Sequence, residues 1–297
     1  MLSVALIVKD EEEFLPDCLA SVQDADEIVV VDTGSTDATP EIAQEFTDKI
    51  VHYEWGDDFA AARNVARANC SGEWIYSIDA DHLNLTPIEE VKAEIERVKA
   101  DHSVASITID DHHNAAWLFQ NAPDIYWVGR VHEVLSRVAT VETNVRQVTR
   151  PREESHSARN LRILQKSPDT PRTRFYLGRE YFELGDYAKA VSWMRRYLDR
   201  PAFPAEEAEA WLTLAKAEWF LHQGEAARAA CLQAIGVNPD FTEALQFMAS
   251  MTYEPWKSKW THIANNSTNQ DVLFRRVGTT NHNQESVCPD QETAKAA

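Results

Sequence analysis

The sequence predicts an α/β domain built on a mainly parallel sheet, followed by an all-α domain of helical repeats. Over the first 110 residues, short apolar runs alternate with amphipathic helical patterns. Polar and acidic residues stand directly after these apolar runs. After residue 174 the chain changes to purely helical units of similar length. We expect a first domain at 1–148, a linker at 149–173, repeats at 174–254 and a polar tail at 255–297, largely disordered after about 278.

The first domain is expected to form its sheet from five apolar, β-prone runs, at 3–8, 27–31, 49–54, 73–79 and 103–110. Helical patterns at 12–22, 57–70 and 87–99, and one through "EIAQEF", separate them. Strands that alternate with helices of this length form right-handed βαβ units and a parallel sheet. Ligands bind such sheets beyond the carboxyl ends of the strands, where this chain places its unusual polar residues. After residue 110 the pattern loosens into short segments that predict mixed strands and a short helix.

The second domain repeats one pattern, in which packing positions of alternating size precede a glycine turn and a helix that ends at proline. Gly185 and Gly224 lie 39 residues apart, and Pro201 and Pro239 lie 38 apart. This spacing resembles the tetratricopeptide repeat stretched by a short insertion, with a generic pair of helical hairpins as the alternative. Residues 240–251 form the first helix of a third unit or a cap. Stacked hairpins present a concave surface, so we expect a protein partner or self-association through the repeats.

Whole-chain properties exclude several classes of protein. The net charge of −19 argues against a general nucleic-acid-coating protein. The four cysteines, Cys18, Cys70, Cys231 and Cys288, lie far apart and fit no metal spacing, so we expect them to stay reduced. No apolar run approaches about 18 residues, and the acidic start lacks the pattern of a signal peptide. We therefore expect a cytoplasmic protein without membrane insertion.

The stretch "VVVDTGSTDAT" places a carboxylate at the end of a strand, followed by a turn of small residues that opens a helix. Asp32 can accept hydrogen bonds from a ribose or a nucleobase edge, while the amides of the turn at Ser35 suit an anionic group. The alternative is purely structural: Asp32 and Asp37 cap a helix and Gly34 makes a turn.

In "WGDDFAAARN", Arg63 stands on a helix whose alanine-rich face is expected to pack closely on the sheet. Asp57 or Asp58 is expected to cap the start of that helix. The arginine can grip a diphosphate, or it can hold nearby carboxylates in a structural salt bridge. Both interpretations stay open from the sequence.

In "WIYSIDADHLN", Asp79 and Asp81 follow the fourth strand. They are two residues apart, so in an extended backbone both carboxylates project to the same side. Converging carboxylates repel each other unless a cation bridges them, and hard oxygen ligands suit Mg²⁺ or Mn²⁺ carried with a diphosphate. The position of the pair after a buried strand, downstream of Asp32, favours this interpretation over a chance match.

Together, "ALIVKDEEEFLPDCLASV", "ADEIVVVDTGSTDAT", "DDFAAARN", "GEWIYSIDAD" and "GRVHEVL" resemble the inverting family-2 glycosyltransferases of the GT-A fold. They resemble in particular the bacterial and phage branch that carries tetratricopeptide repeats after the catalytic domain. The resemblance covers roughly residues 3–251 in the same order. It implies a nucleotide-sugar donor, usually a uridine diphosphate sugar, and a Mn²⁺ or Mg²⁺ cofactor.

By motif position, the resemblance implies nucleoside contacts from Lys9, Asp10, Glu11 and Asp32. It makes Asp79 and Asp81 the DXD pair, with Asp81 the better metal ligand.

Two positions depart from the family pattern. His82 stands where relatives usually continue with a carboxylate, and Thr149 stands where we would look for a histidine. The third metal ligand is therefore open, with His132 as our choice and His156 as the other candidate. His82 is either a replacement ligand or a turn residue.

The resemblance also implies direct displacement with inversion, which needs a carboxylate to take the proton of the acceptor hydroxyl. Our first choice for this base is Glu133, beside His132 in "GRVHE", and the runner-up is Asp110 or Asp111 at the end of the strand "SVASITID". The structural alternative for Glu133 is an exposed charge in the first turn of a short helix.

The function expected from these residues is transfer of a sugar to a hydroxyl of a macromolecular acceptor. Whether that acceptor is a protein, a glycan or a modified DNA base stays open. One alternative is a nucleotidyltransferase, although "IVKDEEE" is acidic where that class needs a glycine-rich, basic loop. The other is a non-catalytic repeat scaffold whose transferase domain has decayed.

Overall fold

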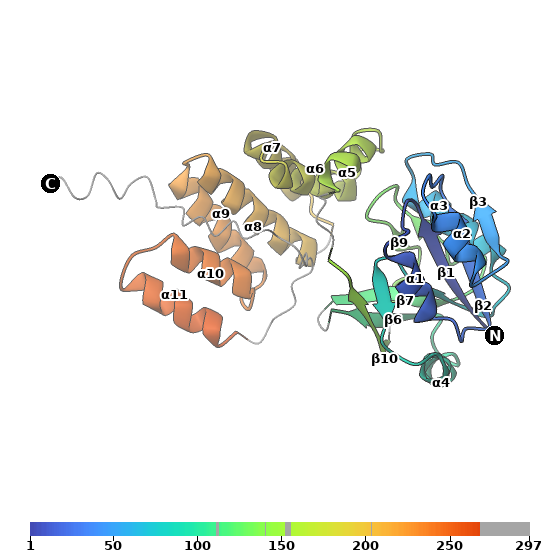
Figure 1. The fold of residues 1–297 in the computed structure, drawn as a ribbon. Helices are drawn as coiled ribbons and strands as arrows, with labels where there is room; N and C mark the ends of the chain where they lie inside the picture. The colour runs from blue at the N-terminus through green and yellow to red at the C-terminus, as the bar shows by residue number, and fades with distance from the viewer. Residues whose placement is uncertain (111–112, 140, 152–155, 203, 268–297) are drawn as a thin grey trace. The chain divides into compact units, whose positions relative to one another are not determined.

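The computed structural model describes residues 1–110, 113–139, 141–151, 156–202 and 204–267 (Figure 1). The chain folds as two compact units, one from Met1 to Arg152 and one from Glu153 onward.

An eight-stranded sheet forms the centre of the first unit, in the order β3-β2-β1-β4-β7-β6-β10-β5. Strands β1 to β4, β6 and β10 run in the same direction, while β7 and β5 are antiparallel to their neighbours. The strands are β1 (Leu2–Val8), β2 (Glu27–Asp32), β3 (Ile50–His52), β4 (Trp74–Ser77), β5 (His82–Asn84), β6 (Val104–Ile109), β7 (His113–Gln120) and β10 (Glu142–Thr149). The five strands expected from the sequence are therefore confirmed, and the mainly parallel sheet with them.

Helices cover both faces of this sheet. On one face, α1 (Leu15–Ala20), α2 (Thr39–Gln44) and α4 (Ile88–Val98) bury apolar side chains against β1, β2 and β4. On the other face lies α3 (Phe59–Asn69), which contributes Ala60 and Ala66 to a second core. Asp58 caps α3, as expected, by accepting a hydrogen bond from the amide of Ala61 at 2.9 Å.

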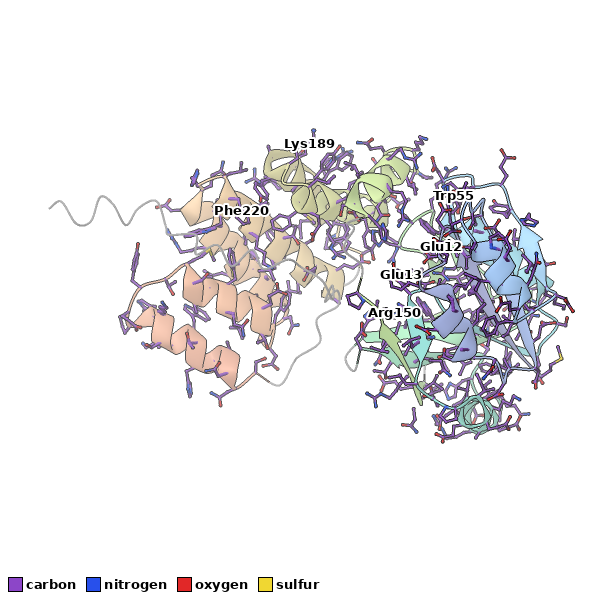
Figure 2. The ribbon with its side chains drawn as sticks, viewed as in Figure 1. Glu12, Glu13, Trp55, Arg150, Lys189 and Phe220 are labelled. Atoms are coloured by element: carbon purple, nitrogen blue, oxygen red, sulfur yellow. The ribbon has the colours of Figure 1, made fainter. Side chains whose placement is uncertain are left out.

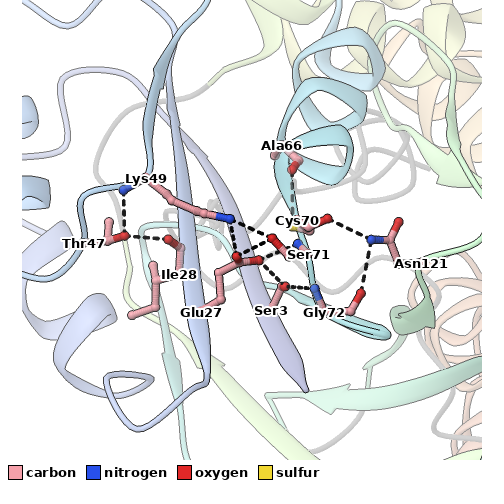
Figure 3. Close-up of polar contacts among 10 residues, drawn as sticks. All are labelled: Ser3, Glu27, Ile28, Thr47, Lys49, Ala66, Cys70, Ser71, Gly72 and Asn121. Carbon is pink, nitrogen blue, oxygen red and sulfur yellow. Dashed lines mark hydrogen bonds and ion pairs between the residues drawn. The ribbon is translucent and has the colours of Figure 1, made fainter.

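A polar network fixes the amino ends of β1, β2 and β4 (Figure 3). The carboxylate of Glu27 pairs with Lys49 and accepts hydrogen bonds from the Ser3 hydroxyl and from the backbone amide of Ser71, the latter at 2.7 Å. The amide of Gly72 donates to the Ser3 hydroxyl at 2.8 Å. Burial alone would raise the pKa of Glu27, but the hydrogen bonds from Lys49, Ser3 and Ser71 lower it to about 2. Because the network holds three strand starts together, it also aligns the opposite, carboxyl ends.

Between β7 and β10 the chain forms a small two-stranded sheet of β8 (Trp127–Val128) and β9 (Val134–Leu135). The expectation of a short helix here is wrong, because residues 113–139 contain strands and turns but no helix. Gly129 and His132 take positive φ values of 97° and 55°, which are incompatible with a right-handed helix. Asn64 of α3 anchors this segment, since its side chain exchanges two hydrogen bonds of 2.9 Å with the backbone of Trp127.

The second unit is helical throughout its described part. Its helices are α5 (Ser157–Gln165), α6 (Pro171–Glu183), α7 (Tyr187–Leu198), α8 (Pro204–Phe220), α9 (Gly224–Val237), α10 (Thr242–Ser250) and α11 (Trp256–Asn265). They pack as successive pairs, α6 with α7, α8 with α9 and α10 with α11 (Figure 1).

Close packing within the repeat pairs explains the small and aromatic positions of the repeat pattern. A Cβ atom on Gly178 of α6 would lie 2.8 Å from Cε of Met194 in α7, so only glycine fits there without a shift of the methionine. Between the first two pairs, the rings of Tyr187 and Phe220 stack with centroids 4.5 Å apart.

Helices also form in the segments expected as a linker and as a tail. The segment at 149–173, expected as a linker, contains α5, which buries Ile163 and Leu164 and joins α6 through a hydrogen bond of 3.2 Å from Asn160 to Glu180. The expected tail at 255–297 contains α11, so α10 starts a third helix pair rather than an isolated cap. The predicted disorder after about 278 lies outside the described residues.

Two whole-chain expectations can be compared with the described residues. Cys18, Cys70 and Cys231 are buried free thiols, while Cys288 lies outside the described part. None of the described helices combines the length and the apolar character that crossing a bilayer requires.

Candidate active site

The loops after β1 and β2 lock together at the carboxyl edge of the sheet. The amide of Asp10 donates to Oγ of Ser35 at 3.0 Å, and the amide of Thr36 donates to Oδ1 of Asp10 at 2.7 Å. The amide of Glu11 donates to Oγ1 of Thr39 at 2.7 Å. The loop after β1, which also carries the exposed Lys9, is thus brought beside the Asp32–Ser35 turn, as a shared site requires.

Asp32 is buried, at 4% exposure, and both of its carboxylate oxygens have a partner. Oδ1 accepts a hydrogen bond of 3.0 Å from the amide of Ser35, and Oδ2 lies 3.2 Å from Nδ1 of His52 at the end of β3. His52 is largely exposed and was not singled out in the sequence. It is recognisable only once β3 is placed beside β2, where Asp32 and His52 are paired in register.

Asp79, Asp81 and His82 form one cluster beyond β4, in which one ligand atom from each residue lies within 4.8 Å of the others. The backbone holds the turn from several sides. The carbonyl of Asp79 accepts hydrogen bonds from the thiol of Cys18 at 3.4 Å and from the amide of His82 at 2.9 Å. The carbonyl of Asp81 accepts from the amide of Arg150 at 2.6 Å. The two carboxylates are therefore brought together, as the sequence predicted.

His82 is buried and belongs to β5 rather than to a free turn. Its ring stacks on Trp117 at 5.4 Å, and Nδ1 lies 2.8 Å from Oε1 of Gln147. Thr149, where the resemblance led us to look for a histidine, is paired in register with His82, and its Oγ1 lies 3.3 Å from Nε2. His132 is not a member of the cluster with the two aspartates. His156 belongs to the second unit rather than to the one that holds this cluster.

Arg63 is buried and lies at the centre of a group of ion pairs. Nη2 donates to Oδ1 of Asp79 at 2.7 Å, Nε donates to Oε1 of Glu133 at 2.6 Å, and Nη1 donates to Oγ of Ser77 at 3.3 Å. Burial by itself opposes the charged guanidinium, but the charges of Asp79 and Glu133 outweigh it and raise the pKa of Arg63 further. These contacts agree with the second interpretation of Arg63, in which it holds nearby carboxylates in a structural salt bridge.

Two tryptophans complete the surroundings of Arg63. The guanidinium carbon lies 5.5 Å from the ring centroid of Trp117 and 5.1 Å from that of Trp127. Both distances are within cation–π range, so the two rings add to the stabilisation of the guanidinium charge.

The two predicted bases, Glu133 and Asp110, have different hydrogen-bond partners in the structure. Glu133 is 11% exposed and pairs with Arg63, so its alternative as an exposed charge on a helix is wrong. Asp110, at a φ of 53°, accepts hydrogen bonds from the amide of Thr149 at 2.8 Å and from its hydroxyl at 2.9 Å. Asp111 lies outside the described residues.

Arg150, another residue that the sequence did not single out, follows β10 and reaches the loop after β1 (Figure 2). Its Nη1 donates to the carbonyl of Glu13 at 3.5 Å and lies 3.1 Å from Oδ2 of Asp17, while the guanidinium covers the ring of Phe14. Arg150 therefore places a positive charge beside the acidic segment that follows β1.

Residues 3–183 match the family described as glycosyl transferase family 2, and residues 171–202 match a tetratricopeptide repeat. The chain belongs to glycosyl transferase family 2. This membership, together with the sheet order, confirms the expected family, the GT-A fold class and the repeats that follow it.

Two curated relatives illustrate the family. A TPR repeat-containing protein of Synechococcus elongatus is 41% identical over 144 residues, covering 45% of this chain and 35% of that protein. The SPbeta prophage-derived glycosyltransferase SunS of Bacillus subtilis is 28% identical over 225 residues, covering 67% of this chain and 53% of SunS. The chain thus spans between about a third and a half of these relatives' length.

Among solved structures, S. aureus TarS 1–349 in complex with UDP covers 82% of this chain and 91% of its own, with 15% identity and a TM-score of 0.41. Glucosyl-3-phosphoglycerate synthase from Mycobacterium tuberculosis, solved with Mg²⁺ and UDP, covers 37% of this chain and 44% of its own, with 22% identity and a TM-score of 0.32.

Proposed function

We propose that this chain is a metal-dependent inverting glycosyltransferase that moves a sugar from a nucleotide-sugar, a UDP-sugar by the resemblance, to a hydroxyl of a macromolecular acceptor. The observation that carries the proposal is that Asp32, at the end of β2, and the Asp79–Asp81 pair, beyond β4, stand at the same carboxyl edge of a family-2 sheet. A nucleotide-sugar needs two features at that edge: a hydrogen-bond acceptor for its nucleoside, and paired carboxylates that hold a cation beside its diphosphate. The relationship to SunS, a named glycosyltransferase, supports the same activity.

The nucleoside end of the donor is assigned to the interlocked loops after β1 and β2. Asp32 is fixed by Ser35 and His52, so its carboxylate can receive a ribose hydroxyl or a nucleobase N–H with little further loss of rotamer entropy. Lys9, Asp10 and Glu11 border the same loops and remain proposed donor contacts.

The diphosphate end is assigned to the aspartate pair. Two carboxylates, Asp79 and Asp81, whose ligand atoms lie within 4.8 Å of each other, are oxygen donors that Mn²⁺ or Mg²⁺ accepts. When bound there, the cation supplies positive charge to the leaving diphosphate. The protein's own part is to hold the carboxylates in place, and Arg63 does this for Asp79.

Arg63 is proposed as a positioning residue for this donor site. Three guanidinium nitrogens donate to Asp79, Glu133 and Ser77, so the residue joins the proposed metal ligand to the proposed base. Its positive charge also offsets the repulsion between the carboxylates that surround it.

Glu133 is proposed as the base. In a direct displacement, the acceptor oxygen forms a bond to the anomeric carbon while the bond from that carbon to the diphosphate oxygen breaks. The acceptor proton passes to the Glu133 carboxylate, and the nucleoside diphosphate leaves with the electron pair of the broken bond. Arg63 occupies Oε1 of Glu133, which leaves Oε2 as the oxygen proposed to take the proton. Asp110 stays the alternative, although both of its oxygens accept hydrogen bonds from Thr149.

The acceptor is proposed to be macromolecular because a repeat unit follows the family-2 unit in one chain. Stacked helical pairs suit a polypeptide, either as the acceptor itself or as a carrier or partner that delivers it. A cytoplasmic location, expected from the sequence, remains part of the same proposal.

A donor screen tests the proposal. The protein is incubated with Mn²⁺ and a panel of nucleotide-sugars, and donor hydrolysis and thermal stabilisation are followed. We expect at least one donor to stabilise the protein, and Asp81→Asn to abolish that effect. The matched control is Asp101→Asn, an exposed aspartate after α4, which should leave the effect unchanged. If no donor stabilises or is hydrolysed, the transferase proposal fails and the decayed-scaffold alternative stands.

A further inference from the structure

Gln147 determines which nitrogen of the His82 ring donates to it. Nε2 of Gln147 lies 3.1 Å from the carbonyl oxygen of Ser77, and a carbonyl can only accept. The amide NH₂ of Gln147 therefore faces Ser77, and its Oε1 faces His82. Since Nδ1 of His82 lies 2.8 Å from that oxygen, the hydrogen-bond network assigns the ring proton to Nδ1.

The other ring nitrogen, Nε2, has the hydroxyl of Thr149 as its hydrogen-bond partner in the described part of the chain. Oγ1 of Thr149 lies 3.3 Å from Nε2 and 2.9 Å from Oδ2 of Asp110. The hydroxyl has one proton, and a charged carboxylate acceptor is the stronger partner for it. The contact of Nε2 with Thr149 is therefore long and shared with Asp110, and a bound cation can replace it.

His82 is buried and clusters with two carboxylates, and the one hydrogen bond of its Nε2 is long and shared with Asp110, so this nitrogen is suited to bind a cation. We propose that Nε2 of His82 is the third protein ligand of the cation held by Asp79 and Asp81, in place of the sequence-based candidate His132. The proposal rests on the proposed function, since that function brings the cation to the aspartates. The cluster distance of 4.8 Å is close enough for small side-chain shifts to bring three ligand atoms around one ion.

The surroundings of His82 hold its ring in the way that a metal site requires. A ligating histidine usually donates its other N–H to an oxygen, which fixes the tautomer and raises the basicity of the ligand. Here Gln147 accepts that proton, the β5–β10 register fixes the backbone, and Trp117 covers the ring with planes 21° apart.

The ligand set determines which cation is preferred. Mg²⁺ takes oxygen ligands almost exclusively, whereas imidazole nitrogen suits first-row transition metals. A site of two carboxylates and one imidazole therefore selects Mn²⁺ over Mg²⁺.

Pulsed electron paramagnetic resonance of the full chain with Mn²⁺ alone tests the proposal directly. We expect the nitrogen modulation of a coordinated imidazole, and a changed pattern when the protein is made with ¹⁵N-histidine. His82→Asn should abolish the modulation and weaken Mn²⁺ binding at least tenfold, whereas the matched variant His132→Asn should keep both. Mn²⁺ titration in competition with Mg²⁺ should show preference for Mn²⁺ that His82→Asn removes.

A further variant keeps the test decisive if His82→Asn does not fold. Gln147→Leu leaves the imidazole in place but releases its tautomer, so it should weaken Mn²⁺ binding by about 10- to 100-fold. The proposal is overturned if Mn²⁺ binds in an Asp81-dependent way without histidine modulation, or if His132→Asn is the variant that removes it. Those outcomes leave the proposed function intact, whereas failure of the wild-type chain to bind Mn²⁺, even with UDP present, removes its metal dependence as well.

Discussion

The guanidinium of Arg63 lies 2.7 Å from Asp79, so an arginine of α3 holds the first aspartate beyond β4. The same guanidinium pairs with Glu133, 70 residues further along the chain. The buried guanidinium of Arg63 thereby connects the proposed metal site to the proposed base. The stability of the fold and the geometry of the site depend on the same side chain.

Replacement of Arg63 should therefore destabilise the first unit strongly. Arg63→Gln leaves two carboxylates without their cation, and loss of one partner of a buried pair typically costs about 3–5 kcal/mol of unfolding free energy. Urea denaturation followed by circular dichroism measures this. The control is Arg137→Gln, which removes an exposed pair with Asp124 and should cost about 1 kcal/mol or less. Equal effects of the two variants would contradict the central role of Arg63.

Glu133→Gln separates catalysis from donor binding. The amide keeps the shape of the side chain but cannot take a proton, so sugar transfer should fall by about 10²- to 10⁴-fold. Donor affinity, measured by calorimetry, should change far less, because Glu133 is not assigned to the donor. Glu90→Gln, at an exposed position of α4, is the matched control. If Asp110→Asn abolishes transfer while Glu133→Gln does not, the base is Asp110.

The parts of the site predicted from sequence are those with local signals. Strand periodicity and the polar residues after each strand located Asp32, Asp79 and Asp81, because the carboxyl ends of parallel strands meet at one edge. The antiparallel strand β5 carries no such signal, since it has only three residues. Its pairing with β10 is what brings His82 to Thr149, 67 residues away.

Other contacts could not be predicted for a related reason. Gln147 and His52 are ordinary polar residues in their own segments, and only the sheet order gives them partners. The positive φ values at Gly129 and His132 prevent the helix that was expected near Glu133. The sequence "GRVHE" gives no clear sign of these backbone conformations, so the prediction was wrong.

The Glu27 network should make folding sensitive to acid. The pKa of Glu27 in the folded chain is about 2, below its ordinary value of 4.5. Its contribution is therefore complete above about pH 4.5 and is lost as the pH falls through about 2. Glu27→Gln should lower the unfolding free energy by up to about 3 kcal/mol at pH 7 and by little near pH 2. Urea titrations between about pH 2 and 7 measure this difference, with Glu45→Gln, at an exposed position, as the matched control.

Gly72 is expected to control how β4 is placed beside β1, and with it the position of Asp79. A Cβ atom on Gly72 would lie 2.6 Å from the backbone nitrogen of Ser3, a distance that side-chain rotation cannot relieve. Gly72→Ala should therefore lower the unfolding free energy by about 1–3 kcal/mol.

The matched control for this glycine is Gly56→Ala, because a Cβ atom there meets nothing within 4 Å. That substitution should be neutral or slightly stabilising, since it mainly restricts the unfolded chain. Because Ser3 is paired in register with Ile75 of β4, strain at Gly72 acts on the strand that leads to Asp79. We therefore expect Gly72→Ala, but not Gly56→Ala, to weaken Mn²⁺ binding as well as stability. If thermal melting shows equal stability for the two variants, the close approach of Gly72 to Ser3 does not constrain the strand.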